Sequence, residues 1–594
     1  MAPSTVGIVL ALALSLSVAL GIPTRPQRAE GVAAGEFVLE SESWAAPKGT
    51  PRADHPVWAW ARASGLYEVH AEGFASLGRA WLEEEEQALL RAATGGSRRS
   101  GDSPLPGPYY AFVPKFQGKV LPAAGAGEEA PAPGGWDSPC FSVNKASATA
   151  PDATGGFDVV IEAASPHGGM LCGDSYLLAS TTTWKVVLVS KAGKTTVRWG
   201  GPGEDAEDLA EYGVRVFRFT QSIAATMESL HQTGLLFYSA LKSVSVPDSA
   251  AKRNLDFLST YAHIDMPARP ITDVAVDESL IQSGDMFGIV RLDGLDPLIM
   301  WGTGSHLGHT AVALRIDGTL YVCESQDKTS YWPKAHVQKT EFSEWLALAK
   351  KADYGVVWLP LGKQARASFD EAAAAAAFHA YEGLPYGFPN LLWGWIDGAD
   401  GNMPDPLHEQ LLMVALALGD PVLTKGGRAS VANQAFAQRL RMPNIATATT
   451  RETYAEARKQ GLTFAQLIAM PEKDKWVYPG GVDASGPYPP GRAMVCNVFV
   501  CTMWKAAGII NATVECSEFT PYDTYELAVF NTDPAARPAA CKAADPSSPF
   551  CQLLGKYAIS LPRWGTSAPF DHMREKCPAT PPDYEDRAAL AGSC

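Results

Sequence analysis

A hairpin signal in the middle of the chain limits the possible folds more than any other feature. Two runs of β-forming residues, 310–316 and 319–324, flank Asp317-Gly318. Asp-Gly between two such runs is a strong short-range signal for a two-residue hairpin turn. The turn places residue 316 opposite residue 319, so the sequence predicts an antiparallel ribbon of known register.

This register gathers polar side chains on one face of the ribbon. His309 falls opposite Gln326, and Glu324 lies diagonally from His309. Because alternate strand residues share a face, these three side chains are expected on one side. Cys323 is expected on the other side, in the core.

A short apolar helix is predicted at 493–508, entered from Pro489-Pro490-Gly491 and ended by Gly508. Cys496 lies in its first turn, where the helix dipole and unpaired N–H groups favour a thiolate. Cys501 lies about 140° further around the helix, so only one of the two can face a given site. The alternative for Cys496 is a buried small residue or half of a disulfide.

Together these elements supply the parts of a cysteine nucleophile. An imidazole that accepts a thiol proton needs its other nitrogen held by an acceptor. We therefore expect Cys496 as nucleophile, His309 as general base and Glu324 as the orienting residue. His306 is the competing histidine.

Metal, cofactor and nucleic-acid chemistry are disfavoured. His408-Glu409 is followed by Leu412 where a zinc-binding H-E-x-x-H motif needs a second histidine, and four-ligand Cys/His spacing is absent. No metal and no cofactor are therefore expected. The net charge of -15 repels phosphate backbones, so no nucleic-acid partner is expected either. The sequence carries no signal for an oligomeric state.

The start of the chain resembles an export signal. Residues 6–20 are apolar or small, too short for a comfortable bilayer span, and Ala19-Leu20-Gly21 fits a cleavage site. Residues 1–21 are thus predicted to be a signal peptide, leaving no transmembrane span after cleavage. A secreted or lumenal location is expected, including a lysosome-like compartment as a possibility, and the secretory pathway is oxidising. Disulfides among the ten cysteines and a glycan on Asn511, in Asn511-Ala512-Thr513, fit that location.

The predicted organisation has three parts after the signal peptide. Residues 22–265 are expected to form a mainly β accessory domain with linkers, in which Cys140 and Cys172 could bridge. Its strands are expected at 109–113, 157–162, 184–190, 195–199 and 213–219. Residues 266–515 are expected to form the catalytic domain, with an insertion at 394–490. Residues 516–594 contain five cysteines and are expected to form a separate Cys-rich tail.

Within the catalytic domain, Ser368-Phe-Asp-Glu371 fits a capping box that opens an alanine-rich helix running to about Tyr381. A second helix is expected at 451–460 in the insertion.

The order of motifs resembles a known family. Ser283-Gly284-Asp285, then Gly308-His309-Thr310, Val322-Cys-Glu324, Gly383-Leu-Pro-Tyr386-Gly and Val495-Cys496-Asn-Val-Phe499 are similar to motifs of the circularly permuted NlpC-type papain-like cysteine hydrolases. In that branch the histidine strand precedes the cysteine helix. The resemblance covers about residues 275–510.

The resemblance implies an α+β papain-like domain, with a small antiparallel sheet packed on helices. It implies thiolate attack by Cys496 on an amide or ester carbonyl and an acyl-enzyme resolved by water. Tyr386 would line the pocket, and Gln326, on the face of His309, is expected to contact the substrate, a peptide or acyl-amide. The chain departs from the family in Asn497-Val498, where permuted members often have Ser-Glu, and in the long insertion.

Three functions remain open at this point. The first is a cysteine hydrolase that cleaves a peptide-type amide. The second is a lipid acyltransferase or thioesterase using the same residues, with Phe388, Trp393 and Trp395 forming an acyl pocket. The third is a non-catalytic binding protein, which predicts a disulfide-bonded Cys496. A free Cys496 would require a further unpaired thiol, such as Cys323 or Cys501.

Overall fold

The computed structural model describes residues 114–122, 135–167, 172–180, 184–200, 209–210, 213–221, 229, 232–237, 244–329, 331–391, 413, 416, 428–462, 466–467, 470, 472–483 and 486–568. The expected signal peptide, the strand expected at 109–113, Trp393 and Trp395 lie outside these residues. The described chain divides into two compact units, one ending at Thr233 and the other beginning at Gly234.

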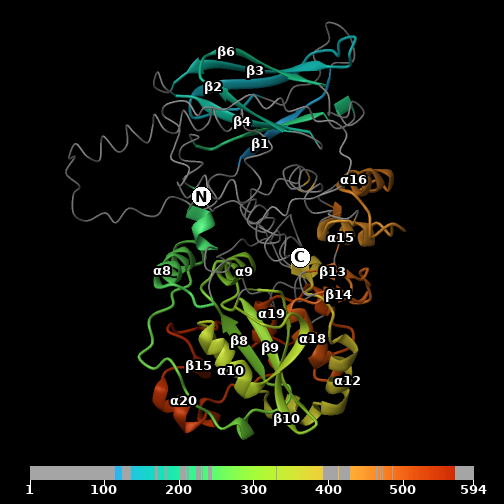
Figure 1. The fold of residues 1–594 in the computed structure, drawn as a ribbon. Helices are drawn as coiled ribbons and strands as arrows, with labels where there is room; N and C mark the ends of the chain where they lie inside the picture. Colours follow the sequence, from blue (N-terminus) through green and yellow to red (C-terminus); the bar gives the residue numbers. More distant parts are fainter. Residues whose placement is uncertain are drawn as a thin grey trace, which may run out of the picture. The chain divides into compact units, whose positions relative to one another are not determined.

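The first unit holds two antiparallel sheets over one shared core (Figure 1). The four-stranded sheet has the order β1-β7-β4-β5, and the three-stranded sheet has the order β2-β3-β6. Their bounds are β1 Lys115–Val120, β2 Phe141–Ala148, β3 Phe157–Pro166, β4 Asp174–Ala179, β5 Trp184–Val189, β6 Gly193–Trp199 and β7 Val214–Arg218.

The core of this unit follows from alternation along its strands. In β3, Phe157, Val159 and Ile161 are buried while the residues between them are less so, as expected for a strand with one face on a core. The strands expected from 157 onward are confirmed. The Cys140–Cys172 disulfide, expected as a possibility, is present.

The second unit is built on a six-stranded antiparallel sheet with the order β11-β10-β9-β8-β12-β15. Its strands are β8 Met286–Val290, β9 His309–Ile316, β10 Thr319–Gln326, β11 His336–Glu341, β12 Gly355–Leu359 and β15 Cys551–Leu554. The expected hairpin register is confirmed, because Ile316 pairs with Thr319 and the pairing continues to Val312 opposite Cys323. Cys323 is fully buried, as expected.

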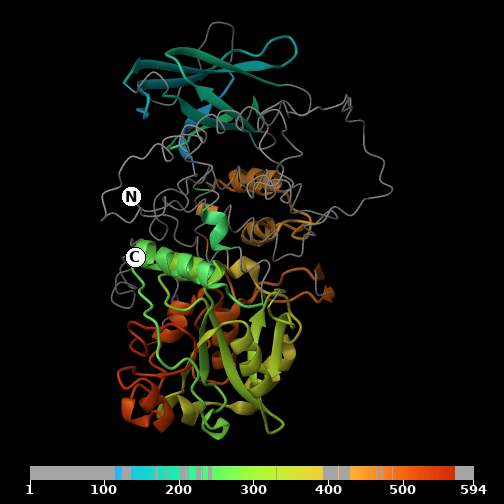
Figure 2. The same ribbon diagram turned by 60° about the vertical axis from the view of Figure 1, so that its left-hand side comes forward.

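Helices surround this sheet (Figures 1 and 2). Their bounds are α8 Asp248–Phe257, α9 Leu295–Thr303, α10 Phe342–Lys351, α11 Lys363–Ser368, α12 Glu371–Tyr381, α15 Val431–Arg439, α16 Thr450–Lys459, α18 Cys496–Ala506, α19 Pro521–Glu526 and α20 Ala539–Ala544. Short turns of other helix types are η1 Leu258–Ala262, η2 Glu278–Leu280, η3 Cys516–Glu518 and η4 Pro534–Ala536, and the ribbon β13 Gly481–Asp483 and β14 Gly486–Tyr488 lies before α18. The fold of this unit is therefore mixed α+β with antiparallel sheets.

Two helices position the site. On α10, Phe342 and Trp345 are buried in one core with residues of β8, β9 and β10. The apolar helix α18 packs against β9, β10 and α12. It begins at Cys496, three residues later than the predicted start at 493, so Cys496 lies in its first turn as predicted.

The predicted start of the alanine-rich helix is wrong in one respect. The cap of α12 is Asp370, whose side chain accepts from Ala373 N, and Ser368 is instead the last residue of α11. The helix itself, including its end at Tyr381, is confirmed. The helix expected at 451–460 is present as α16 and carries a capping box of Thr449 and Glu452.

The expected domain boundaries also need correction. The boundary expected near residue 265 falls inside the second unit, because α8 packs there: Asn254 donates to Leu292 O, and Phe257 contacts the Trp301 ring. The described part of the expected tail is not a separate appendage. Cys516 is bonded to Cys501 of α18, and β15 pairs with β12 at the edge of the sheet.

The cysteines agree with an exported chain. The described residues contain the disulfides Cys140–Cys172, Cys501–Cys516 and Cys541–Cys551, and the free thiols of Cys323 and Cys496. Disulfides of this kind are compatible with a secreted or lumenal protein. Within the described part of the chain, no helix has both the length and the hydropathy that crossing a bilayer requires.

Candidate active site

The first pair of the site lies on neighbouring strands. His309 begins β9, Glu324 lies near the end of β10, and the hairpin register brings them together. The Nε2–H of His309 donates to Glu324 Oε2 at 2.7 Å. This is the contact expected of a base and its orienting residue, and it leaves Nδ1 as the ring nitrogen available to a second partner.

The second oxygen of Glu324 is held by two residues that sequence reasoning missed. Oε1 accepts from Gln338 Nε2 at 2.8 Å and from the indole Nε1 of Trp345 at 3.1 Å. Gln338 is fixed in turn by Thr340, whose hydroxyl donates to Gln338 Oε1 at 3.0 Å. Glu324 has no exposed surface, so these donors fix its orientation in a dry site.

Cys496 is the first residue of α18 and is only 2% exposed. No side chain caps the N-terminus of this helix, so its first N–H groups remain available to a ligand. The helix is anchored beside the site, because Cys501 is bonded to Cys516 and Asn497 Nδ2 donates to Phe519 O. Cys501 is thus paired, and of the two cysteines suggested as the further unpaired thiol, Cys323 is the free one.

The pKa of His309 depends on the neighbouring Cys496. Burial alone would lower the pKa of His309. The charge of Cys496 and hydrogen bonding with it, together with the hydrogen bond to Glu324 and its charge, outweigh burial and raise this pKa well above its usual value. The imidazole therefore lies between the Cys496 sulfur and a carboxylate, and a negative charge on either favours its protonated form.

Tyr386 lies against the same thiol. Burial and the charge of Cys496 raise the pKa of the Tyr386 phenol well above its usual value, and Cys496 also acts on it through a hydrogen bond. The two segments approach closely because Gly387 has no side chain: its N–H donates to Met494 O, and a Cβ there would lie 2.2 Å from Met494 N.

Cys496 lines a very small pocket, with a cavity volume of about 10 Å³. Its walls come from α9, the start of β9, the segment after α12, the start of α18 and the segment before α19. The lining residues are Ile299, Gly308, Tyr386, Asn390, Leu391, Val495, Cys496, Asn497, Phe519, Thr520 and Pro521.

A larger groove, with a cavity volume of about 80 Å³, shares Tyr386 with this pocket. We call it the aromatic groove, because four aromatic rings and four prolines line it, with charged groups at Asp327, Lys328 and Arg492. Val431 and Gln434 of α15 also line it, so the expected insertion supplies one wall. The rings and prolines are Tyr386, Phe388, Tyr478, Tyr488, Pro385, Pro389, Pro479 and Pro489.

Other expected residues lie elsewhere. Gln326 is buried, donates to the Tyr354 hydroxyl at 3.4 Å, and lines neither the small pocket nor the aromatic groove. His306 contacts Ser560 at 3.0 Å, and burial lowers its pKa to about 4. Asn511 is exposed, as a glycan site requires.

Burial raises the pKa of the other free thiol, Cys323, well above its usual value. In the described ranges, no group of three or more His, Cys, Asp or Glu side chains is arranged to hold a metal ion.

Comparison of the chain with family models, with curated proteins and with solved structures gave no match.

Proposed function

We propose that this protein is a cysteine hydrolase that cleaves a peptide-type amide bond through Cys496, His309 and Glu324. One observation carries the proposal: a free thiol begins a helix beside a histidine whose Nε2–H is held by a buried carboxylate. The motif resemblance to permuted NlpC-type papain-like hydrolases supports the same assignment and the papain-like character of the second unit.

In the proposed reaction, His309 Nδ1 takes the thiol proton and the sulfur attacks the substrate carbonyl carbon. The negative charge that develops on the carbonyl oxygen is stabilised by the Cys496 N–H at the helix start. His309 then gives its proton to the leaving amine, and the acyl group remains on sulfur. Water, deprotonated by His309, releases the acid and restores the thiol.

The aromatic groove supports a substrate that extends beyond the scissile bond. It shares Tyr386 with the small pocket around Cys496, so a chain running from the reacting carbonyl would lie against rings and prolines. Gln326 has no place in this proposal, because its amide faces Tyr354.

A second candidate is a lipid acyltransferase or thioesterase that uses the same thiol. The apolar rings of the aromatic groove favour it, since they suit an alkyl chain as well as apolar peptide side chains. In that reaction the acyl group leaves the sulfur for an acceptor other than water, or a thioester replaces the amide.

The third function, a non-catalytic binding scaffold, is less well supported. It predicts a disulfide at Cys496, whereas this thiol is free. The first unit is assigned an accessory role in a secreted or lumenal protein.

The test is alkylation of the purified chain with iodoacetamide at pH 6, followed by peptide mapping. An ordinary thiol is mostly protonated at this pH, so selective modification of Cys496 that is lost in His309→Ala would support an activated nucleophile. His306→Ala is the matched control, because this histidine contacts Ser560 and its loss should leave the rate unchanged.

Substrate assays then separate the two catalytic candidates. Hydrolysis of peptide amides, with no transfer from lipid acyl donors, would support the amidase, and the reverse pattern would support the acyltransferase. A Cys496 that is unreactive in the folded protein would refute both.

A further inference from the structure

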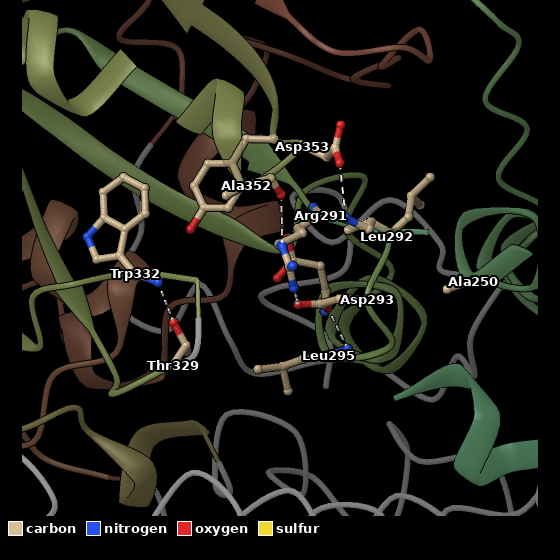
Figure 3. A network of polar contacts seen from close by, with 12 residues as sticks. Ala250, Arg291, Leu292, Asp293, Leu295, Thr329, Trp332, Ala352 and Asp353 are labelled. Atoms are coloured by element: carbon tan, nitrogen blue, oxygen red, sulfur yellow. Dashed lines mark hydrogen bonds and ion pairs between the residues drawn. The ribbon is translucent and has the colours of Figure 1, made fainter. Parts of the chain in front are cut away.

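A network of buried polar contacts lies around Arg291 and Asp293 at the start of α9 (Figure 3). The Arg291 side chain is 1% exposed, and its Nη1 pairs with Asp293 at 2.6 Å. Its Nε donates to Ala352 O at 3.0 Å. The other oxygen of Asp293 accepts from Leu295 N at 3.0 Å, so this ion pair fixes the first turn of the helix.

Asp296 stands in that first turn and is a buried carboxylate that the proposed reaction does not use. It is 7% exposed, and its Oδ2 accepts from the Arg291 backbone N–H at 2.6 Å. It packs directly on Gly308, where a Cβ would lie 2.2 Å from both Cβ and Cγ of Asp296. Only glycine fits this position, and the next residue is His309.

The charge of the imidazole acts on the carboxylate. Burial, and then the charge of Asp293, raise the pKa of Asp296 to about 7, while the charge of His309 lowers it. His309 thus has a second carboxyl group nearby, that of Asp296, in addition to Glu324.

The charged and titratable groups around the two residues come from several elements. The pKa of His309 or of Asp296 is affected by Glu324 of β10, Cys496 of α18, Arg291 and Asp293. The charge of Asp296 in turn raises the pKa values of Tyr331, Tyr354 and Tyr386.

We propose that Asp296 is a positioning residue whose negative charge, held against Gly308, stabilises the protonated form of His309 and with it the thiolate of Cys496. This inference rests on the proposed function. Glu324 orients the ring by a hydrogen bond, whereas Asp296 acts on it through charge from the neighbouring helix.

The test compares iodoacetate with iodoacetamide as alkylating agents of Cys496 across pH. A protonated His309 beside the thiolate attracts the anionic reagent, and this preference disappears as the pH rises through the pKa of His309. In Asp296→Asn the preference should disappear at a pH lower by about one unit, the size of shift that loss of a nearby opposite charge produces. Asparagine can still accept from the Arg291 N–H, so the helix start is preserved.

Asp317→Asn is the matched control. It makes the same chemical change in the turn of the hairpin that carries His309, at a left-handed position (φ 53°) that asparagine tolerates. Its reagent preference should change at the wild-type pH. An Asp296→Asn protein that is folded and behaves like this control would overturn the inference.

A measurement on the wild-type protein covers the case in which Asp296→Asn does not fold. The imidazole NMR signal of His309 should show a second inflection near pH 7, from Asp296, and its absence would also overturn the inference. Failure of the proposed function gives a different result, because Cys496 would then be unreactive toward both reagents in the wild-type protein.

Discussion

Replacing Glu324 by glutamine tests how the site controls the position of one proton. The substitution exchanges one carboxylate oxygen for an N–H donor without changing shape. At present Oε2 accepts from His309, and Oε1 accepts from Trp345 and Gln338. An amide can present its oxygen to only one side.

Of the two orientations of the new amide, one leaves a buried donor unpaired. With its oxygen toward His309, its N–H group faces the indole of Trp345, which can only donate, at a cost of about 1–3 kcal/mol. Gln338 can still pair with the new N–H group, because its amide can rotate by 180° so that its oxygen accepts from that group and its own N–H donates to the Thr340 hydroxyl. With the N–H group toward His309, the ring accepts at Nε2 and carries its proton on Nδ1, so every donor is paired.

The second orientation is therefore favoured, and it disables His309 as the proposed base. An imidazole protonated on Nδ1 cannot take the proton of Cys496. At about 1.4 kcal/mol per tenfold, the productive form falls to between about one-fifth and one-hundredth of the molecules. The rate of iodoacetamide alkylation of Cys496 at pH 7, followed by peptide mapping, should fall by the same factor. Cys323 serves as an internal control, because burial keeps its thiol protonated.

A double variant isolates the cause. Trp345→Phe removes the indole donor, so combining it with Glu324→Gln should restore part of the rate, while Trp345→Phe alone should stay near the wild-type rate. If the folded Glu324→Gln protein alkylates within about twofold of wild type, the orienting role of Glu324 is refuted. A double variant no faster than Glu324→Gln would refute the explanation by proton position.

Three further predictions concern the walls of the site. Gly387→Ala should lower both the Tm and the alkylation rate of Cys496, because its Cβ meets backbone, whereas Gly383→Ala, with no atom within 4 Å of its Cβ, should cost only about 1 kcal/mol of backbone strain. From pH 5 to 6.5 the wild-type protein should lose about 1.4 kcal/mol per pH unit relative to Asp296→Asn in urea unfolding. The reason is that burial raises the pKa of this carboxyl to about 7, so the folded state keeps a proton that the unfolded chain has lost. Tyr488→Ala should raise the KM for substrates with a long apolar flank and leave the alkylation rate unchanged, and an unchanged KM would remove the groove from the substrate site.

The parts of the site set by local rules could be predicted from the sequence. The Asp317-Gly318 turn fixed the register that places His309 beside Glu324. The helix start signal at Pro489-Pro490-Gly491 and the stop signal at Gly508 placed Cys496 in the first turn of α18. Both arguments need only the residues within one hairpin or one helix, where the spacing of side chains is known.

The supporting residues depend on long-range packing and gave no such signal. Trp345 is separated from Glu324 in the sequence by the whole of strand β11. Only the packing of α10 on β10 brings its indole to Glu324. Asp296 reads as an ordinary acid in the first turn of a helix. Its partner Gly308 entered the prediction only as part of the Gly308-His309-Thr310 motif, although a glycine directly before a candidate base could have indicated a close neighbour.

The tail was misjudged for the same reason. A segment rich in proline and cysteine was expected to be held together by its own bridges, and Cys541–Cys551 is such a bridge. Cys516, however, bonds to α18, and the short strand β15 completes the sheet edge next to β12. Strand pairing between segments so far apart depends on the whole fold.

The Cys501–Cys516 bond also makes the order of oxidation and helix folding decide whether Cys496 remains a free thiol. Cys496 and Cys501 share one helix, and only its folded geometry turns Cys501 toward Cys516 and Cys496 toward the imidazole. In a chain oxidised before α18 forms, either thiol can capture Cys516, and a Cys496–Cys516 bond would consume the nucleophile. Thiolate exchange is then the only route back. A disulfide isomerase should therefore raise the fraction of chains in which Cys496 is free, and a strong oxidant supplied alone should leave more chains with Cys516 bonded to Cys496.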